Sequence, residues 1–342
     1  MELSEKVKNL SPAKRALLLQ KMRDEMARVK DAKRIPRRDS DGPCPLSYAQ
    51  QGLWFLDQLD PGSLSFVNSN SVRFTGSLNM AALQQSLNEI IRRHEALRTI
   101  FPIMNGQPVQ IVIPRLSVNL TVVDFETLPE NLFDQATQLL ASMGQRPFDL
   151  AHGPLLRVSL FRINPQEFIL LFTVHDIICD GWSMSLLIKE IRAIYEAYSG
   201  GETSRLEELP IQYADYAIWQ RERLQGELLE SEMRYWKRQL EAAPVLEMPT
   251  DRLRPAHSAY QGGAQAIVID PTVTAALRKM SRRHSATMYM MLMAGFQVLL
   301  SRYSGQTDIV VGTPIAGRNR AGIEGLIGFF INMLAVRTRL DG

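Results

Sequence analysis

Residues 168–183 read Phe168-Ile-Leu-Leu-Phe-Thr-Val174-His175-Asp176-Ile-Ile-Cys-Asp180-Gly181-Trp-Ser183. The first half is apolar at nearly every position, so both faces of a strand formed there would be buried. We therefore predict a central strand over residues 168–174, inside a sheet with material packed on each face. The second half places three ionisable residues beside a glycine, where the strand ends and a helix begins.

These ionisable residues, His175, Asp176 and Asp180, permit two interpretations. A strand end that turns at a glycine such as Gly181 presents side chains and free backbone N–H groups to a crevice. Acyl-transfer chemistry needs that arrangement for a base and an oxyanion donor. In the other interpretation the turn is structural, and His175 and Asp180 are only hydrogen-bonded within it. The residues by themselves leave both interpretations open.

Helical and strand-like patterns alternate on both sides of this stretch, which is typical of a mixed α/β sandwich. The chain has 342 residues, of which 45% are apolar, so we expect two lobes with separate cores. The predicted helices cover residues 47–57, 80–94, 131–145, 183–199, 271–284 and 287–303, and a long charged helix follows residues 213–219 and ends at 238. The predicted strands cover residues 71–75, 109–113, 155–162, 168–174, 264–269 and 308–312, with a helix–strand region at 328–337.

Residues 1–40 differ from the rest of the chain in charge, with 12 Lys/Arg against 6 Asp/Glu. The charges alternate in sign, and apolar residues recur at helical spacing at Leu17, Leu18, Met22 and Met26. This pattern favours an amphipathic linker or protein-docking helix over a nucleic-acid-binding arm, because no aromatic or Gly/Arg interleaving accompanies the charge. The Pro-, Asp- and Gly-rich residues 35–45 are predicted to be an irregular linker into the folded body.

Several classes of protein are not expected. No apolar run reaches the ~20 residues of a membrane helix, and the N-terminus lacks the basic-then-apolar order of a secretory signal. Only Cys44 and Cys179 could pair, and no histidine has a second ligand at metal spacing. We therefore expect a cytoplasmic protein without a membrane span, a metal site or a nucleic-acid partner, in which Cys179 is a packing residue.

A series of motifs resembles the condensation domains of non-ribosomal peptide synthetases, which share the fold of chloramphenicol acetyltransferase. The resemblance implies a two-lobed α/β sandwich of that type, and it extends over residues 47–342. The motifs lie in the family's order at Ser47–Leu56, Arg93–Phe101, Arg146–Leu150, Gly153–Arg157, Tyr213–Trp219, Tyr303–Arg318 and Ile327–Asn332.

The central motif departs from the family's pattern, His-His-x-x-x-Asp-Gly, because Asp176 stands where the second histidine positions or deprotonates the attacking amine. Three alternatives remain open. A carboxylate with a reference pKa near ~3.9 becomes a useful base only if burial raises that pKa. Asp176 could instead hold the protonated amine by charge and hydrogen bonding. In the third alternative, the exchange abolishes the chemistry while the fold survives.

The resemblance also implies roles for the neighbouring residues and a division of the chain. His175 belongs to the catalytic motif, Asp180 would be structural and paired with Arg98, and Ser183 would support the same turn. Gly181 would bring an N–H toward a thioester carbonyl. Residues 1–40 would be the linker or docking helix, 41–205 the N-terminal lobe, and 206–342 the bridge and an incomplete C-terminal lobe, since relatives continue through further motifs.

The activity implied by the resemblance is amide formation between an acyl donor and an aminoacyl acceptor. Donor and acceptor carrier-protein domains would deliver both groups on phosphopantetheine, residues 1–34 would contact an upstream synthase, and the domain itself would bind no cofactor. A second hypothesis is a non-catalytic docking platform for carrier proteins or tailoring enzymes. A third is a free-standing acyltransferase that uses soluble thioesters.

Overall fold

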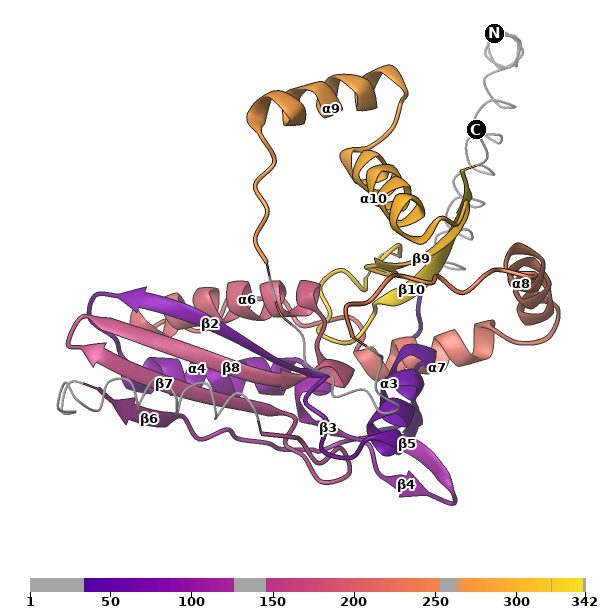
Figure 1. Ribbon diagram of the computed structural model, residues 1–342. Helices are drawn as coiled ribbons and strands as arrows, with labels where there is room; N and C mark the ends of the chain where they lie inside the picture. Colours follow the sequence, from indigo (N-terminus) through magenta and orange to yellow (C-terminus); the bar gives the residue numbers. More distant parts are fainter. Residues whose placement is uncertain (1–33, 126–145, 253–262, 264, 321, 341–342) are drawn as a thin grey trace, which may run out of the picture. The chain divides into compact units, whose positions relative to one another are not determined.

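A computed structural model describes residues 34–125, 146–252, 263, 265–320 and 322–340 of the chain (Figure 1). These residues form two compact units, of which the first runs to Arg223 and also contains Ala316–Phe330, while the second comprises Leu224–Ile315 and the chain from Ile331 onward. We predicted the lobe boundary at 205/206, and the structure has it at Arg223/Leu224. The predicted helices within residues 1–33 and at 131–145 lie outside the described residues.

The first unit is built on a sheet of four strands in the order β2-β8-β7-β6. Strand β8, Glu167–His175, pairs antiparallel with both neighbours, β2 (Val67–Thr75) and β7 (Leu156–Asn164), which confirms that it is a central strand. The outer strand β6, Thr121–Asp124, runs parallel to β7.

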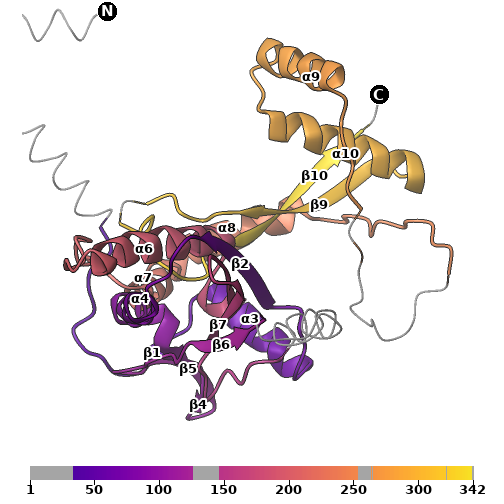
Figure 2. The same ribbon diagram turned by 90° about the vertical axis from the view of Figure 1, so that its left-hand side faces the viewer.

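The two faces of β8 are both apolar, but they enter different clusters. Leu170, Phe172 and Val174 belong to the main core, whereas Ile169 and Leu171 pack against a small cluster formed by Phe125 and Phe161. Helices α4 (Met80–Arg93) and α6 (Gly181–Ser199) pack against each other and cover one face of the sheet (Figure 2). The alternation of a strand thus sends successive side chains into two cores, as the apolar sequence predicts.

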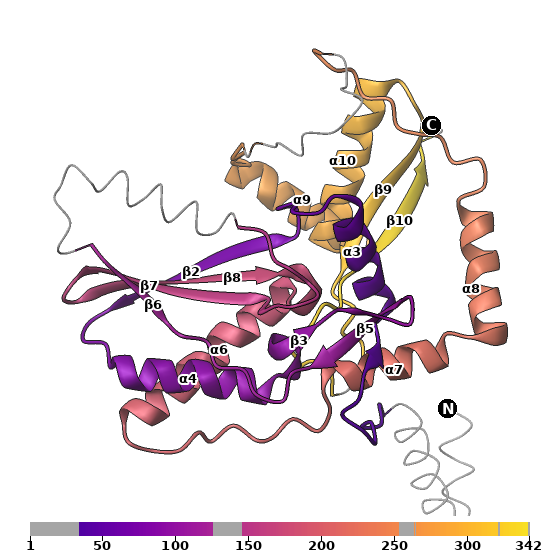
Figure 3. The same cartoon turned by 90° about the horizontal axis from the view of Figure 1, so that it is seen from below.

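A smaller group of strands surrounds β5, Gln107–Val112, and lies beside α7, Tyr213–Arg223 (Figure 3). Helix α3, Tyr48–Leu59, begins at Ser47 with a capping box in which Ser47 and Gln50 satisfy each other's backbone N–H groups. The remaining short elements of this unit are β1 (Cys44–Pro45), η1 (Glu95–Arg98), β3 (Thr99–Ile100), β4 (Ile103–Met104) and η3 (Asp176–Ile178).

The described part of the predicted linker packs on the first unit. Ile35 is 2% exposed, and the Arg38 guanidinium lies 2.7 Å from Glu95 and 3.1 Å from Asp215. Residues 44–45 then pair with β5. Residues 35–43 have no helix or strand, as predicted for an irregular linker, but the segment is anchored by one buried apolar side chain and one buried ion pair.

The second unit contains α8 (Gly226–Gln239), α9 (Pro271–Arg283), α10 (Met288–Ser304) and the antiparallel pair β9 (Asp308–Ile315) and β10 (Asn332–Arg339). Three predictions here were wrong. The long charged helix is broken at residues 224–225 into α7 and α8, and the described part of residues 264–269 pairs with no described strand. The helical half of the region 328–337 is irregular at residues 328–330, whereas its strand half is confirmed by β10. None of the described helices is long and apolar enough to cross a membrane.

Candidate active site at the end of strand β8

The motif residues lie where β8 passes through a single 3-10 turn into α6. His175 is the last residue of β8, Asp176 opens η3, and Asp180 caps α6 by accepting a hydrogen bond from the Ser183 N–H at 2.7 Å. An acidic N-cap also meets the positive end of the helix dipole. The structure therefore brings His175, Asp176, Asp180, Gly181 and Ser183 together, and α6 begins two residues earlier than predicted.

His175 is held inside the first unit as a neutral ring. It is 2% exposed and lies between the rings of Phe66 and Phe148, each with its centroid 6.3 Å away. Its Nδ1 accepts a hydrogen bond from the Ile177 N–H at 3.1 Å, so the neutral ring carries its proton on Nε2. Burial lowers the pKa of His175 to about 4, and the ring is therefore uncharged near neutral pH.

Asp176 has a different environment because its side chain is only partly buried. Its backbone N–H donates to the Phe66 carbonyl at 2.8 Å, and its Oδ1 accepts a hydrogen bond from Asn68 Nδ2. Burial, with a smaller contribution from the negative charge of Asp180, raises the pKa of Asp176 to about 6, while the Asn68 hydrogen bond opposes the rise. A carboxyl group with that pKa is close to the range in which general bases work.

Asp180 is fixed by a buried network that reaches far along the chain. Its two carboxylate oxygens lie 3.2 and 3.4 Å from Arg318 Nη2, and Oδ2 also accepts the Phe330 N–H at 3.0 Å. Ser183 Oγ accepts from the same Arg318 nitrogen at 2.6 Å and donates to the Gly328 carbonyl at 2.8 Å. Ser183 therefore supports the turn, and Asp180 is a structural residue in this geometry.

The predicted pairing of Asp180 with Arg98 is wrong. Arg98 donates to the Ile113 carbonyl at 2.6 Å and lies 3.8 Å from Glu95, so its guanidinium belongs to the end of β5. The partner of Asp180 is Arg318, the last residue of the motif Tyr303–Arg318. Both arginines stand in motifs of the family, and sequence alone does not reveal which of them returns to the strand end.

The segment that carries Arg318 is shaped by two glycines. Gly317 has φ +65°, and a Cβ there would lie 2.1 Å from the Phe330 carbonyl oxygen. A Cβ on Gly328 would lie 1.9 Å from the ring of Tyr213, which is fully enclosed and whose hydroxyl contacts Ser47 Oγ at 2.8 Å. Only glycine allows residues 316–330 to lie this close to α7 and α6.

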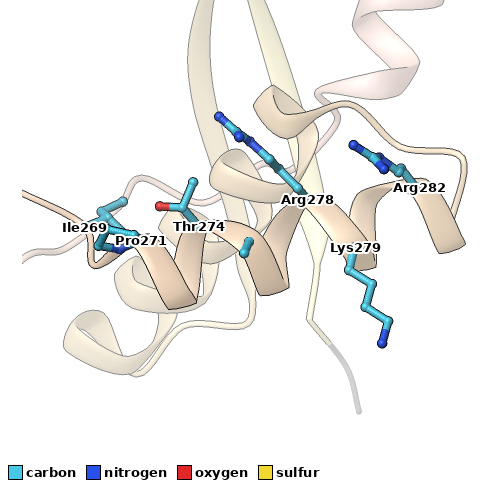
Figure 4. Close-up of a pocket in the computed structure, with 7 residues that line it drawn as sticks. Ile269, Pro271, Thr274, Arg278, Lys279 and Arg282 are labelled. Atoms are coloured by element: carbon cyan, nitrogen blue, oxygen red, sulfur yellow. The ribbon is translucent and has the colours of Figure 1, made fainter.

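The other candidate features do not add chemistry to the site. Burial raises the pKa of the Cys179 thiol, so it stays protonated and packs in the core as predicted. Among the described residues there is no cluster of three metal-ligating side chains. A pocket of about 570 Å³ lies along α9 in the second unit, but none of the motif residues lines it, and Lys279 points away from Arg278 there (Figure 4).

The sequence model of the condensation domain family matches residues 40–342. The chain belongs to this family. One protein of the linear gramicidin synthase of Brevibacillus parabrevis is 48% identical over 90% of this chain, which covers 4% of that protein. Phosphinothricin tripeptide synthetase PhsC of Streptomyces viridochromogenes is 41% identical over 99% of this chain, which covers 32% of it. The condensation domain described here thus spans a small part of the curated relatives it matches.

Solved structures share the mixed α/β fold of the condensation domain. The X-domain in complex with OxyB from teicoplanin biosynthesis is 30% identical with a TM-score of 0.80, covering 91% of this chain and 67% of that one. The first condensation domain of the calcium-dependent antibiotic synthetase, in complex with a substrate analogue, is 22% identical with a TM-score of 0.71, covering 87% and 70%. The second likeness bears on the fold alone.

Proposed function

We propose that this condensation domain forms an amide bond between a donor acyl thioester and the amine of an aminoacyl acceptor, with Asp176 as the group that takes the amine proton. The observation that carries the proposal is the environment of Asp176. It is the partly exposed carboxylate of the motif, and its pKa is raised to about 6. His175 and Asp180, which flank it, are buried and engaged by the fold.

The proposed step uses the strand end as a platform. The acceptor nitrogen forms a bond to the thioester carbonyl carbon, the carbon–sulfur bond breaks, and the phosphopantetheine thiolate leaves. Asp176 receives the proton that the nitrogen loses. The N–H of Gly181 stands at the first position of α6, where a helix has no acceptor of its own, so it is free to face the carbonyl oxygen.

The proposed partners follow from this reaction. Donor and acceptor carrier-protein domains would deliver both substrates on phosphopantetheine, and the domain would bind no cofactor of its own. Contact of residues 1–34 with an upstream synthase is part of the same proposal. Support comes from relatives that are peptide synthetases, such as the linear gramicidin synthase protein.

The test is single-turnover transfer between loaded donor and acceptor carrier proteins, followed by mass spectrometry of the acceptor. We expect Asp176→Asn, which keeps the shape and removes the charge, to lower the rate by ~10²–10⁴-fold. Asp60→Asn is the matched control, because Asp60 is an exposed carboxylate at the end of α3. Equal transfer by the wild type and Asp176→Asn would refute the role of Asp176.

A second candidate function is a non-catalytic docking platform. The likeness to the X-domain, found in a complex with OxyB, favours it, as does the absence of the second motif histidine. This alternative predicts no transfer by wild type, Asp176→Asn or Asp176→His, although each remains folded by circular dichroism. Transfer by Asp176→His alone would indicate a lapsed catalytic site.

A further inference from the structure

Asn68 lies on β2, the strand that pairs with β8 on one side, and its amide contacts the carboxylate of Asp176. In the register of this pair Val67 is opposite His175 and Asn68 is opposite Val174. Asp176 is therefore the diagonal neighbour of Asn68. A polar side chain can span the distance between diagonal neighbours on antiparallel strands. The backbone hydrogen bond from the Asp176 N–H to the Phe66 carbonyl extends the pairing beyond Val67 and His175, and so holds Asp176 in this diagonal position.

The two oxygens of Asp176 have different surroundings. Oδ1 accepts the hydrogen bond from Asn68 Nδ2, whereas Oδ2 accepts none from the residues that the structure describes. A carboxylate held by one oxygen has a fixed rotamer and presents the other oxygen in a fixed direction. In other enzymes a second residue orients the general base by a hydrogen bond, and here the amide of Asn68 is placed to do the same for Asp176.

We infer that Asn68 is a positioning residue for Asp176: it holds Oδ1 and keeps the carboxylate ionised, so that Oδ2 faces the acceptor amine. This inference rests on the proposed function, in which Asp176 takes the amine proton. The amide acts as a donor to the charged form of the carboxylate and therefore favours ionisation. Without it, burial and the charge of Asp180 would act on Asp176 unopposed.

Of the groups that face Asp176 from the neighbouring elements, Asn68 is the one that lowers the pKa of Asp176. Asp180, at the start of α6, raises it. His175 at the end of β8 and Cys179 after η3 are uncharged near neutral pH because burial lowers the pKa of the ring and raises that of the thiol. From α3, the amide of Gln50 binds the Ile177 carbonyl and carries no charge.

The experiment uses the whole chain and three variants. Asn68→Ala removes the donor, and Asn68→Asp keeps the shape but replaces the donor by a like charge. Asn70→Ala is the matched control, because Asn70 lies two residues along on the same face of β2 and is exposed. The rate of single-turnover transfer is measured from pH 5.5 to 9 and divided by the wild-type rate at each pH, which cancels the titration of the acceptor amine.

We expect Asn68→Ala to be about tenfold slower than wild type at pH 6.5 and within about twofold at pH 9, where the carboxylate is ionised in both. Asn68→Asp should be slower still at pH 6.5, although it preserves the shape of the side chain. Asn70→Ala should match the wild type throughout. A constant loss at all pH values in Asn68→Ala would mean a merely structural role and would overturn the inference.

A second readout separates this inference from the proposed function. The pKa of Asp176 is measured by ¹³C NMR of its carboxyl carbon, assigned from its absence in Asp176→Asn, and this requires no activity. Asn68→Ala and Asn68→Asp should both raise that pKa, and Asn70→Ala should leave it unchanged. An inactive wild type would refute the proposed function alone. An unchanged pKa in both folded Asn68 variants would refute the role of Asn68 alone.

Discussion

Burial of the Asp176 carboxyl group lowers the free energy of unfolding by an amount that depends on pH, because only the ionised form is costly to bury. Its pKa is raised to about 6 from an ordinary value near 3.8, so the folded chain binds a proton there more tightly than the unfolded chain does. The contribution of Asp176 to stability is therefore most favourable below pH ~4, where both states are protonated, and is lost as the pH rises through 6. The loss amounts to about 1–2 kcal/mol once solvent screening of a partly exposed group is allowed for.

Asp176→Asn should remove this cost, because the amide is uncharged at every pH. We expect its melting temperature to exceed that of the wild type by about 2–4 °C at pH 8 and to equal it at pH 4. Differential scanning calorimetry at the two pH values measures the difference. Asp60→Asn makes the same charge change at an exposed position and should show no such pH dependence. A gain of equal size at pH 4 would mean that charge is not the cause.

The Asp180–Arg318 pair predicts a coupling that an Asp180–Arg98 pair would not give. Removing one partner of a buried ion pair leaves an uncompensated charge and costs ~3–5 kcal/mol. Asp180→Asn and Arg318→Met should each destabilise the first unit, and the double variant should lose much less than the sum. Asp180→Asn combined with Arg98→Met should be additive. Thermal unfolding of the five variants measures both cycles, and coupling only to Arg98 would contradict the geometry.

The parts of the site that sequence could identify are those adjacent along the chain. His175, Asp176, Asp180 and Gly181 follow one another within seven residues, so any turn keeps them together. Arg318 is 138 residues from Asp180, and several arginines compete for the role on sequence grounds. Asn68 lies in an ordinary polar strand, and only the register of β2 on β8 brings it to Asp176.

At the scale of elements, prediction succeeded where the apolar pattern of a segment and its capping residues indicate both the element and the faces that it buries. The doubly apolar β8 and the capped helices α3, α4 and α10 agree with the structure to within a few residues. Residues 264–269 have the β-branched composition of a strand, but a strand also needs a hydrogen-bonding partner, and the described part has none. Residues 316–330 carry no periodic pattern of apolar residues. Their position is fixed instead by the hydrogen bonds of Arg318 and by two glycines.

Gly328 gives a direct test of how this segment is held. Its missing Cβ leaves room for the Tyr213 ring, so Gly328→Ala should cost about 1–3 kcal/mol by forcing the segment from α7. Hydrogen exchange should increase at the amides of positions 328 and 330, whose N–H groups bind Ser183 and Asp180 in the wild type. Gly325→Ala is the matched control, because a Cβ there meets only Leu209 at 4.0 Å. Equal exchange in the two variants would contradict the steric argument.

At the scale of the whole molecule, the chain crosses between its two units more than once. It leaves the first unit at Arg223, returns for Ala316–Phe330 and leaves again at Ile331. The returning segment supplies Arg318, so the strand end with Asp176 and Asp180 is complete only when a distant part of the chain has folded onto it. A single boundary, such as the one we predicted at 205/206, does not describe a return of this kind.

The N-terminal side of the first unit is anchored in a comparable way, by Arg38. Its guanidinium pairs with Glu95 and with Asp215, whose side chain is fully buried. In Arg38→Met, Asp215 would lose this cation and Glu95 would keep only Arg98, at 3.8 Å. We expect that variant to lose ~3 kcal/mol, since a buried acid left without its partner is costly. Arg37→Met changes the same charge at an exposed neighbour and should be neutral.

Truncation extends the test from Arg38 to the predicted linker or docking helix, residues 1–40. Removing residues 1–33 should leave the melting temperature nearly unchanged if they act only in docking. Removing residues 1–40 should lower it at least as much as Arg38→Met, because Ile35 is lost as well. Thermal unfolding at low and high salt completes the comparison, since a buried pair is screened little. If both truncations behave alike, or if salt removes the effect of Arg38→Met, the ion pair does not anchor this end of the unit.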